Sequence, residues 1–262
     1  MLTRKLKGLI VASTVAAAAL LSTCAVLADD LQKIQDAKEI RIAMSGQYSP
    51  FSFANEQNQI VGFDASISEA LAERMGVKVT IVTTPFDGII AGLLAKKYDA
   101  IIASMTITPE RQKAVDFVGP YYHAGRTIVV KEGSPIQSLD DLKDVTVGVT
   151  LGDAHDKWAR ARGNLKVRTY KGLPEMLVDL EAGRINALVM DSVPVLVAVK
   201  ETGQKVRIIT PPESDGGIEG MGIALRKNNP ELKATMQQAL QDMLADGTYE
   251  KISMKWIGND IR

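Results

Sequence analysis

The sequence is poor in the residues that build covalently stabilised or metal-stabilised folds. Its 262 residues include one cysteine, Cys24, and two histidines, His123 and His155. We therefore expect no internal disulfide, no metal site and no cofactor. The 31 basic residues are balanced by 31 acidic ones, so the chain lacks the basic excess typical of proteins with a nucleic-acid partner. The remainder, 46% apolar and 24% charged, is ordinary globular composition.

Long apolar runs are confined to the first thirty residues. Arg4, Lys5 and Lys7 precede an Ala-rich run over residues 8–21, and a Val-Leu-Ala sequence follows as a typical cleavage site. This pattern predicts a secretory signal peptide over residues 1–28, because the run is too short and too Ala-rich for a stable membrane anchor. We expect a soluble, mildly acidic mature protein in the periplasm.

Cys24 supports an alternative for the N-terminus. The sequence Leu-Ser-Thr-Cys at residues 21–24 is similar to a lipoprotein box, in which Gly or Ala usually precedes the cysteine. Thr23 makes lipid attachment at Cys24 the less favoured alternative. Both alternatives place the mature protein outside the cytoplasm.

Short β-rich runs alternate with capped helices along the chain. The strand candidates are residues 40–44, 77–82, 100–103, 127–130, 145–150, 187–190 and 222–225. Helix signals between them include a capping box at residues 66–69 and a Thr108–Pro109 start. The alternation predicts an α/β architecture with mostly parallel sheets. Because no flexible linker divides the chain, extended crossovers must join any two lobes.

Signatures of common enzymes are absent from the sequence. It contains no G-x-S-x-G, no Walker loop and no G-x-G-x-x-G at a strand-to-helix turn. The two histidines stand far apart and without a second ligand nearby. The sequence therefore indicates a binding protein rather than an enzyme.

Four segments in order carry a family resemblance. They are YSPFSF at residues 48–53, GFD at 62–64, YDA through TITPER at 98–111, and DGTY through KWIG at 246–258. Together they resemble the bacterial extracellular solute-binding proteins of family 3, the polar-amino-acid capture subunits of ABC importers. The resemblance covers residues 31–262, and the segment at 108–111 with Asp-Phe at 116–117 and Tyr-Tyr at 121–122 is its most specific part.

The resemblance implies a two-lobed, type II periplasmic-binding-protein fold. Each lobe would be a mixed sheet flanked by helices, with the ligand in the cleft between the lobes. Lobe one would comprise residues 29–125 plus 216–262, and lobe two residues 126–215. The implied function is to capture an amino acid by lobe closure and deliver it to a membrane permease. The implied protein is a monomer.

Arg111 and Asp191 are the principal candidate ligand-binding residues. An α-amino acid carries a carboxylate and an ammonium on one carbon, so its site needs a cation and an anion on opposite sides. Arg111 lies in the first turn of a predicted helix, where its guanidinium and the backbone N–H groups favour a carboxylate. The alternative is a surface ion pair with Glu110 or Asp116. Asp191 is either a plain helix N-cap or, as the resemblance implies, also the acceptor of the ligand's ammonium.

The resemblance adds further positions to the site. Ser104 and Thr106 match residues that offer backbone and hydroxyl hydrogen bonds to the ligand. Tyr48 and Phe86 match aromatic residues that sandwich the ligand's carbon chain, although a core position is the alternative. Ser45 stands where binders of basic amino acids can carry Asp.

The Asp-Ala-His sequence at residues 153–155 departs from the Thr-Thr of many relatives. Asp153 either caps the following helix and points away from the cleft, with Asp156 completing the turn, or faces the cleft and selects a cationic ligand. His155 is a candidate specificity residue beside it.

Arg111 is the one cation that the sequence places in the cleft. An acidic amino acid would need a second cation, because burying an unpaired charge is costly. We therefore expect a neutral polar or cationic amino acid, with modified amino acids and opine-like compounds left open. The alternative function is a cyclohexadienyl (prephenate or arogenate) dehydratase on the same fold, with Asp153 or His155 as the acid. The Arg111–Asp191 pair argues against this enzyme, because it matches an amino-acid clamp.

Overall fold

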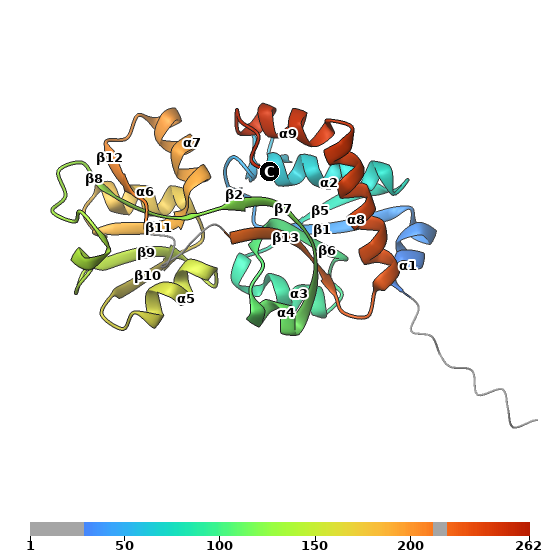
Figure 1. The fold of residues 1–262 in the computed structure, drawn as a ribbon, viewed down its shortest axis with the longest axis horizontal. Coiled ribbons are helices and arrows are strands. Elements are labelled where there is room, and N and C mark those ends of the chain that lie inside the picture. Colours follow the sequence, from blue (N-terminus) through green and yellow to red (C-terminus); the bar gives the residue numbers. More distant parts are fainter. Residues whose placement is uncertain (1–28, 212–218) are drawn as a thin grey trace, which may run out of the picture.

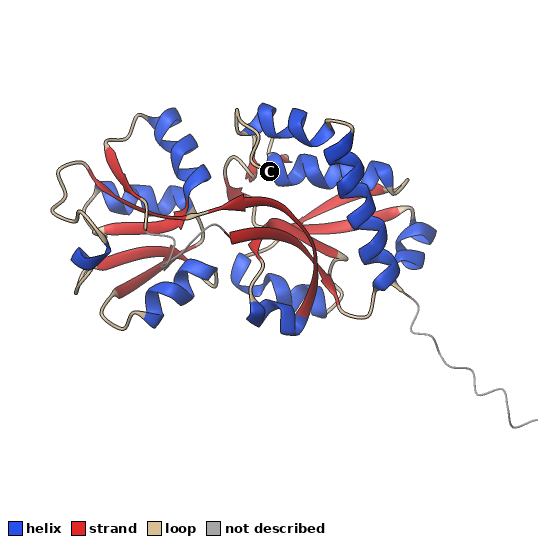
Figure 2. Ribbon diagram, in the orientation of Figure 1, coloured by secondary structure: helices blue, strands red, loops and turns tan. Residues whose placement is uncertain are grey.

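The computed structural model describes residues 29–211 and 219–262, which fold into two lobes lying side by side (Figure 1). The predicted signal peptide, Cys24 and the predicted lobe boundary at residues 215 and 216 lie outside the described residues. Each lobe contains a five-stranded sheet with helices packed against it (Figure 2). Within the described part of the chain, no helix has the length and apolarity needed to cross a bilayer.

The first lobe contains a mixed sheet with the strand order β5-β1-β6-β13-β7. Its strands are β5 (Lys78–Thr83), β1 (Glu39–Met44), β6 (Ala100–Thr106), β13 (Glu219–Arg226) and β7 (Val115–Ala124). Strand β1 pairs parallel with β5 and β6, whereas β13 is antiparallel to β6 and β7. The helical elements are α1 (Asp30–Ala37), α2 (Phe63–Arg74), the 3₁₀ turn η1 (Phe86–Gly88), α3 (Ile89–Leu94), α4 (Pro109–Ala114), α8 (Pro230–Ala245) and α9 (Thr248–Trp256). A small antiparallel sheet adds β2 (Gln47–Tyr48), β3 (Ser52–Ala54) and β4 (Ile60–Val61).

The second lobe repeats this plan with the strand order β10-β9-β11-β8-β12. Its strands are β10 (Lys166–Tyr170), β9 (Thr146–Thr150), β11 (Ala187–Asp191), β8 (Arg126–Lys131) and β12 (Val206–Ile209). Strand β9 is parallel to β10 and β11, and β8 is antiparallel to β11 and β12. The helical elements are the 3₁₀ turn η2 (Leu139–Asp141), α5 (Ala154–Ala161), α6 (Leu173–Glu181) and α7 (Ser192–Thr202).

Both sheets are mixed, as the family resemblance implied, so the prediction of mostly parallel sheets was wrong. The antiparallel strands β8 and β13 do not follow a helix that returns the chain to the same sheet. Strand β7 passes almost directly into β8, with only Gly125 between them, and this extended segment runs from the first lobe into the second (Figure 1). The lobe limits 29–125 plus 216–262 and 126–215 remain a prediction.

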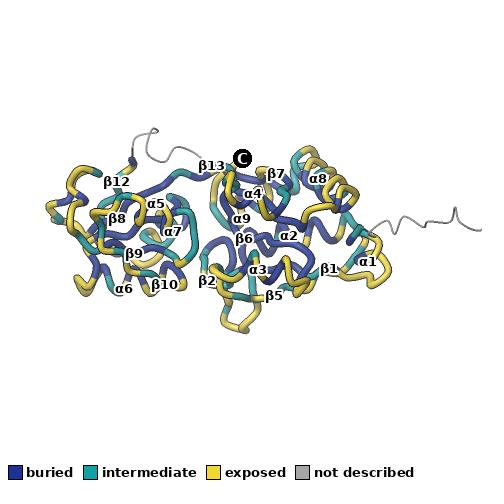
Figure 3. The backbone as a smooth tube through the Cα atoms, turned by 90° about the horizontal axis from the view of Figure 1, so that it is seen from below, coloured by how far each residue is buried: buried dark blue, intermediate teal, exposed yellow. Residues whose placement is uncertain are grey.

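The apolar core follows the strand pattern. All seven residues of β6 are buried, as is typical of a central strand covered on both faces. In β8, Ile128 and Val130 pack on one face of the sheet and Val129 on the other, because successive side chains of a strand alternate. Buried residues therefore line the central strands of both lobes, and exposed ones gather on the outer helices and loops (Figure 3).

Helix α2 begins three residues before the predicted capping box. It starts at Phe63, and Ser66 makes no cap but accepts a hydrogen bond from Trp256 Nε1 at 2.9 Å. Gly62 precedes the helix with a φ of 128°, and a Cβ there would lie 2.3 Å from the carbonyl oxygen of Phe51. This close turn, which only glycine fits, fixes the helix start in place of the serine. The predicted cap at Thr108 is confirmed, since its hydroxyl accepts from Arg111 N at 3.2 Å.

A buried arginine joins the first helix to the sheet of the first lobe. The Nε of Arg226, at the end of β13, donates to Asp30 Oδ2 at 2.8 Å. Its NH1 donates to the carbonyls of Leu93 at 2.9 Å and Tyr98 at 2.6 Å. Because these groups lie on β13, α1, α3 and the loop before β6, Arg226 connects parts of the chain that are distant in sequence.

Replacing this arginine should destabilise the fold strongly. Arg226→Leu removes the buried guanidinium from Asp30 Oδ2 and from two carbonyls, although Lys33 still donates to Asp30 Oδ1. We expect the free energy of unfolding to fall by roughly 3–5 kcal/mol. Urea denaturation followed by circular dichroism measures this change. The matched control is Lys227→Leu, whose exposed ammonium lies 3.5 Å from Asp116 and should contribute less than about 1 kcal/mol. Equal losses in the two variants would contradict the assignment.

Candidate functional site

A cavity of about 40 Å³ lies where the two lobes meet. Every residue predicted for the ligand site lines it. The first lobe contributes Ser45, Gln47, Tyr48, Phe86, Ala103, Ser104, Thr106 and Arg111. The second lobe contributes Thr150, Asp153, Ala154, His155, Lys171 and Asp191. The structure thus brings the predicted residues together, whereas their binding of a ligand remains a prediction.

Arg111 lies on the wall of this cavity and is only 6% exposed. Its NH1 donates to the carbonyl of Thr106 at 2.9 Å, and its NH2 reaches the carbonyl of Gly152 in the other lobe at 3.4 Å. The ring of Phe86 lies over the guanidinium, 5.5 Å from ring centroid to Cζ. Burial lowers the pKa of Arg111, and the carboxylate of Asp153 opposes this shift. A guanidinium has five N–H donors, so the two carbonyl bonds leave donors for an anion.

The alternative of a surface ion pair for Arg111 was wrong. Glu110, the next residue in α4, pairs with Lys157 at 2.7 Å. Asp116 pairs with Lys227 at 3.5 Å. Arg111 instead turns inward, because Thr108 fixes the first turn of α4 and the carbonyls of β6 and of the 150–153 turn receive its donors.

Asp191 directs its carboxylate into the cavity. It occupies the N-cap position of α7, but its side chain makes no cap hydrogen bond, so a plain capping role is wrong. Oδ2 accepts a hydrogen bond from the Tyr48 hydroxyl of the first lobe, and Oδ1 lies 3.2 Å from His155 Nε2. Burial and the Asp191 carboxylate raise the pKa of Tyr48, so the phenol stays protonated and donates across the cleft.

Sequence reasoning did not identify Arg126, which stands behind His155. The Nε of Arg126 donates to His155 Nδ1 at 3.3 Å, and both side chains are buried. When His155 is neutral, this contact places its ring proton on Nε2, from which it donates to Asp191. Burial lowers the pKa of His155, but the carboxylates of Asp153 and Asp191 outweigh this effect and raise it. Arg126 pairs in register with Asp191 across β8 and β11, and strand pairing of this kind cannot be read from a local motif.

Asp153 both caps its helix and faces the cavity, two placements that the sequence presented as alternatives. Its carboxylate caps α5 by accepting from Asp156 N at 2.7 Å, while Asp156 Oδ2 accepts from Gly152 N at 3.1 Å. Asp153 also lines the cavity, so the expectation that a capping Asp153 would point away from the cleft was wrong. Burial raises its pKa to about 6, with His155 acting in the opposite direction.

Ser104 is held in a left-handed backbone conformation by a buried carboxyl group. Its φ is 52°, its N–H donates to Tyr121 Oη at 2.9 Å, and its hydroxyl donates to Asp64 Oδ2 at 2.8 Å. The Tyr121 hydroxyl donates to Asp64 Oδ1 at 2.7 Å. The Ser104 hydroxyl is therefore open to a ligand only as an acceptor. The Gly-Phe-Asp segment that contains Asp64 was part of the family resemblance, but the sequence did not predict that Asp64 would hold Ser104.

The remaining predicted residues line the first-lobe side of the cavity. Thr106 ends β6, where its carbonyl holds Arg111. Ser45 follows β1, and its hydroxyl accepts from Gln47 N at 3.3 Å. Lys171, from the second lobe, was not predicted and brings another cation to the wall, so Arg111 is not the sole cation of the cleft. Among the residues described, no group of three or more His, Cys, Asp or Glu side chains is placed to hold a metal ion.

Asp64 makes the stability of the first lobe depend on pH. Burial raises its pKa from 3.8 to about 7, although the Tyr121 and Ser104 hydrogen bonds act to lower it. The folded state then retains a proton that the unfolded state releases between about pH 4 and pH 7, so this group lowers the free energy of unfolding as the pH rises through that window.

Asp64→Asn should make the pH dependence of stability shallower between pH 4 and pH 7. The amide can still pair with Tyr121 and Ser104, because both hydroxyls can reverse their direction. Urea unfolding at several pH values measures the slope, and Asp140→Asn on the exposed surface is the matched control. An unchanged slope in the Asp64 variant would show that this carboxyl titrates normally.

Comparisons with known proteins identify the family of this chain. The family model of bacterial extracellular solute-binding proteins, family 3, matches residues 40–259. The L-cystine-binding protein TcyJ of Escherichia coli is 35% identical over 88% of this chain and 87% of its own length. An L-arginine-binding protein of Pseudomonas aeruginosa is 37% identical, over 86% of this chain and 90% of its own.

A solved structure with the same fold gives a further comparison. It is the ancestral amino acid-binding protein AncCDT-1, a precursor of cyclohexadienyl dehydratase, with a TM-score of 0.80 and 38% identity over 87% of this chain and 99% of its own. The family match extends over most of the residues that form both lobes and the cavity. The chain therefore belongs to family 3 of the bacterial extracellular solute-binding proteins.

Proposed function

We propose that this protein is the periplasmic substrate-binding subunit of an ABC importer and captures an amino acid between its lobes. The observation that carries this proposal is the placement of buried Arg111 and Asp191 on opposite lobes around one cavity. The ligand's carboxylate binds Arg111 and its ammonium binds Asp191. The amino-acid ligands named for the cystine-binding and arginine-binding relatives support this class.

The contacts of Asp191 prepare it to receive an ammonium group. Tyr48 and His155 each occupy one of its oxygens and so fix the plane of the carboxylate. A carboxylate accepts about four hydrogen bonds, so both oxygens retain acceptor sites for the ligand. Arg126 acts through His155 as a positioning residue.

Ligand entry requires the lobes to move. A volume of about 40 Å³ accommodates a water molecule but not an amino acid. Contacts across the cleft, from Tyr48 to Asp191 and from Arg111 to the Gly152 carbonyl, hold this volume small. The extended crossover at Gly125 is suited to act as a hinge, and a membrane permease would bind the closed, loaded protein as its partner. The protein acts as a monomer in this scheme.

A second cation in the cleft bears on the class of ligand expected from the sequence. Aspartate and glutamate were disfavoured as ligands because Arg111 was the sole cation expected in the cleft. Lys171 also lines the cavity, so that reason no longer holds. The Asp153 carboxylate on the cavity wall still disfavours an acidic side chain. A neutral polar or cationic amino acid remains the proposed class.

The protein is proposed not to be an enzyme, although a dehydratase has one specific observation in its favour. Asp153, with a pKa near 6 at the cavity wall, is suited to donate a proton. Its carboxylate is however bonded to the N-terminus of α5, and the Arg111–Asp191 pair fits an amino acid rather than prephenate. Release of phenylpyruvate from added prephenate would establish the enzyme.

Arg111→Ala should abolish most amino-acid binding. Loss of a buried charge partner costs roughly 2–5 kcal/mol, which weakens the affinity by a factor of roughly 30 or more. Isothermal titration with the refolded, ligand-stripped protein measures the change, and Arg184→Ala on the exposed surface is the matched control. An Arg111→Ala affinity within threefold of the parent protein would refute the carboxylate assignment.

Asp191→Asn should weaken the binding of amino acids, because the ligand loses a charge partner, while the thermal unfolding temperature changes little. The amide keeps the shape of the side chain but loses the charge that attracts the ammonium. A thermal-shift screen of all amino acids reports binding directly, because a ligand at a hundredfold its Kd adds about 2.7 kcal/mol. Retention of the parent's full shift would assign the ammonium to another group.

A further inference from the structure

A second and larger cavity continues outward from the proposed amino-acid site. Its volume is about 740 Å³, and it is lined by both lobes. The residues shared by the two cavities are Ser45, Gln47, Phe86, Thr150 and Lys171. A ligand whose α-carbon lies between Arg111 and Asp191 would therefore extend its side chain past these residues into the outer cavity.

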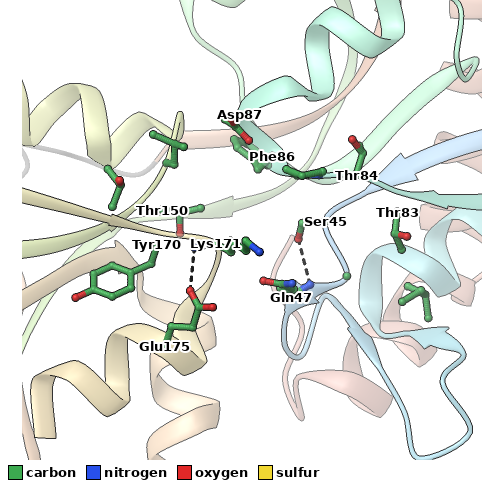
Figure 4. A pocket seen from close by; sticks show the side chains of 15 residues that line it. Ser45, Gln47, Thr83, Thr84, Phe86, Asp87, Thr150, Tyr170, Lys171 and Glu175 are labelled. Carbon is green, nitrogen blue, oxygen red and sulfur yellow. Dashed lines mark hydrogen bonds between the residues drawn. The ribbon is translucent and has the colours of Figure 1, made fainter. Parts of the chain in front are cut away.

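Charges of both signs lie on the wall of the outer cavity. Lys171 and Glu175 come from the second lobe, and Asp87 comes from η1 of the first. In Figure 4 the ammonium of Lys171 points into the space between Ser45 and Gln47. Glu175 Oε2 accepts from Lys171 N at 3.3 Å, which fixes this carboxylate beside the same segment. A cation and carboxylates thus stand within one cavity, as they do in the inner site.

The lobes approach each other closely on either side of this wall. A Cβ on Gly172, next to Lys171, would lie 2.4 Å from the carbonyl oxygen of Gln47. A Cβ on Gly152 would lie 3.0 Å from the Cα of Asp87. Backbone contacts of this kind leave no freedom for larger residues, so they fix where the charges of the two lobes meet.

We propose that the outer cavity binds a second amino-acid head, so that the ligand class is an amino acid with two zwitterionic ends. The proposal rests on the proposed function, which assigns the first head to Arg111 and Asp191. The distal carboxylate would bind Lys171 and the distal ammonium would bind Glu175, while Asp87 adds negative charge to the wall of the same cavity.

Simpler ligands fit these charges less well. A cationic side chain would pass the Lys171 ammonium at the junction of the two cavities, where like charges repel. A neutral side chain would make no charge-assisted contact with the cation and the two carboxylates of the outer wall. A zwitterionic head supplies one partner of each sign.

Titration calorimetry of the refolded protein tests the proposal with L-cystathionine as the two-headed probe. L-Methionine is the probe with one head on a similar chain, and L-arginine is the probe with a cationic end. We expect L-cystathionine to bind at least about tenfold more tightly than either, because one charge-assisted hydrogen bond gives about that factor.

Lys171→Gln and Glu175→Gln identify the subsite. Each should reduce the ratio of cystathionine affinity to methionine affinity by about tenfold. The matched controls are Lys166→Gln in β10 and Glu181→Gln at the end of α6, which remove the same charges from exposed positions outside both cavities. They should leave the ratio unchanged.

Two results would overturn the inference, and a third would refute the proposed function on which it rests. Tighter binding of L-arginine than of L-cystathionine, strengthened further by Lys171→Gln, would show that the outer cavity accepts a cation. Equal affinities for L-methionine and L-cystathionine would show that the distal head makes no contact. No measurable binding of any amino acid would instead refute the proposed function itself. Failure of the inference and failure of the proposed function can therefore be distinguished.

Discussion

A guanidinium buried in the cleft sets the conditions for the rest of the site. Among the described residues, the hydrogen-bond partners of the Arg111 guanidinium are the carbonyls of Thr106 and Gly152. Carbonyl dipoles compensate a buried cation only in part, and the carboxylates of Asp153 and Asp191 act on it from a greater distance. In the proposed function, the carboxylate of the ligand completes this balance. The first lobe therefore contributes this buried cation, and the second lobe contributes the carboxylates of Asp153 and Asp191 on the wall of the same cavity.

Local sequence patterns predicted the parts of the site that depend on one element. The Thr108 cap of α4 and the α/β alternation follow from short motifs. The set of residues that line the cavity was instead implied by the family resemblance. The contact of Arg126 with His155 and the place of Lys171 could not be predicted in this way. They depend on the strand order β10-β9-β11-β8-β12 and on the antiparallel course of β8, which no local period encodes.

Competition between local signals explains the other differences. A serine capping box predicted the start of α2, but the turn at Gly62 begins the helix earlier, because the Phe51 carbonyl leaves space for no side chain there. Asp191 stands at the N-cap position of α7, yet its carboxylate contacts Tyr48 and His155 instead of the backbone of the helix. Asp153 caps its helix and lines the cavity at once. At Gly62 and Asp191 a contact with a residue outside the local motif decides between two locally acceptable conformations.

The contacts that join the lobes across the cleft make the closed, unliganded form a competitor of the ligand. Tyr48 bonds to Asp191, and Arg111 reaches the Gly152 carbonyl of the opposite lobe, so together they hold a cavity too small for an amino acid. The observed affinity is then the intrinsic affinity multiplied by the fraction of molecules whose cleft is open. Substitutions far from the cleft that favour the separated lobes would raise that fraction. Capture and release are thereby adjusted by the balance between the lobes as well as by contacts with the ligand.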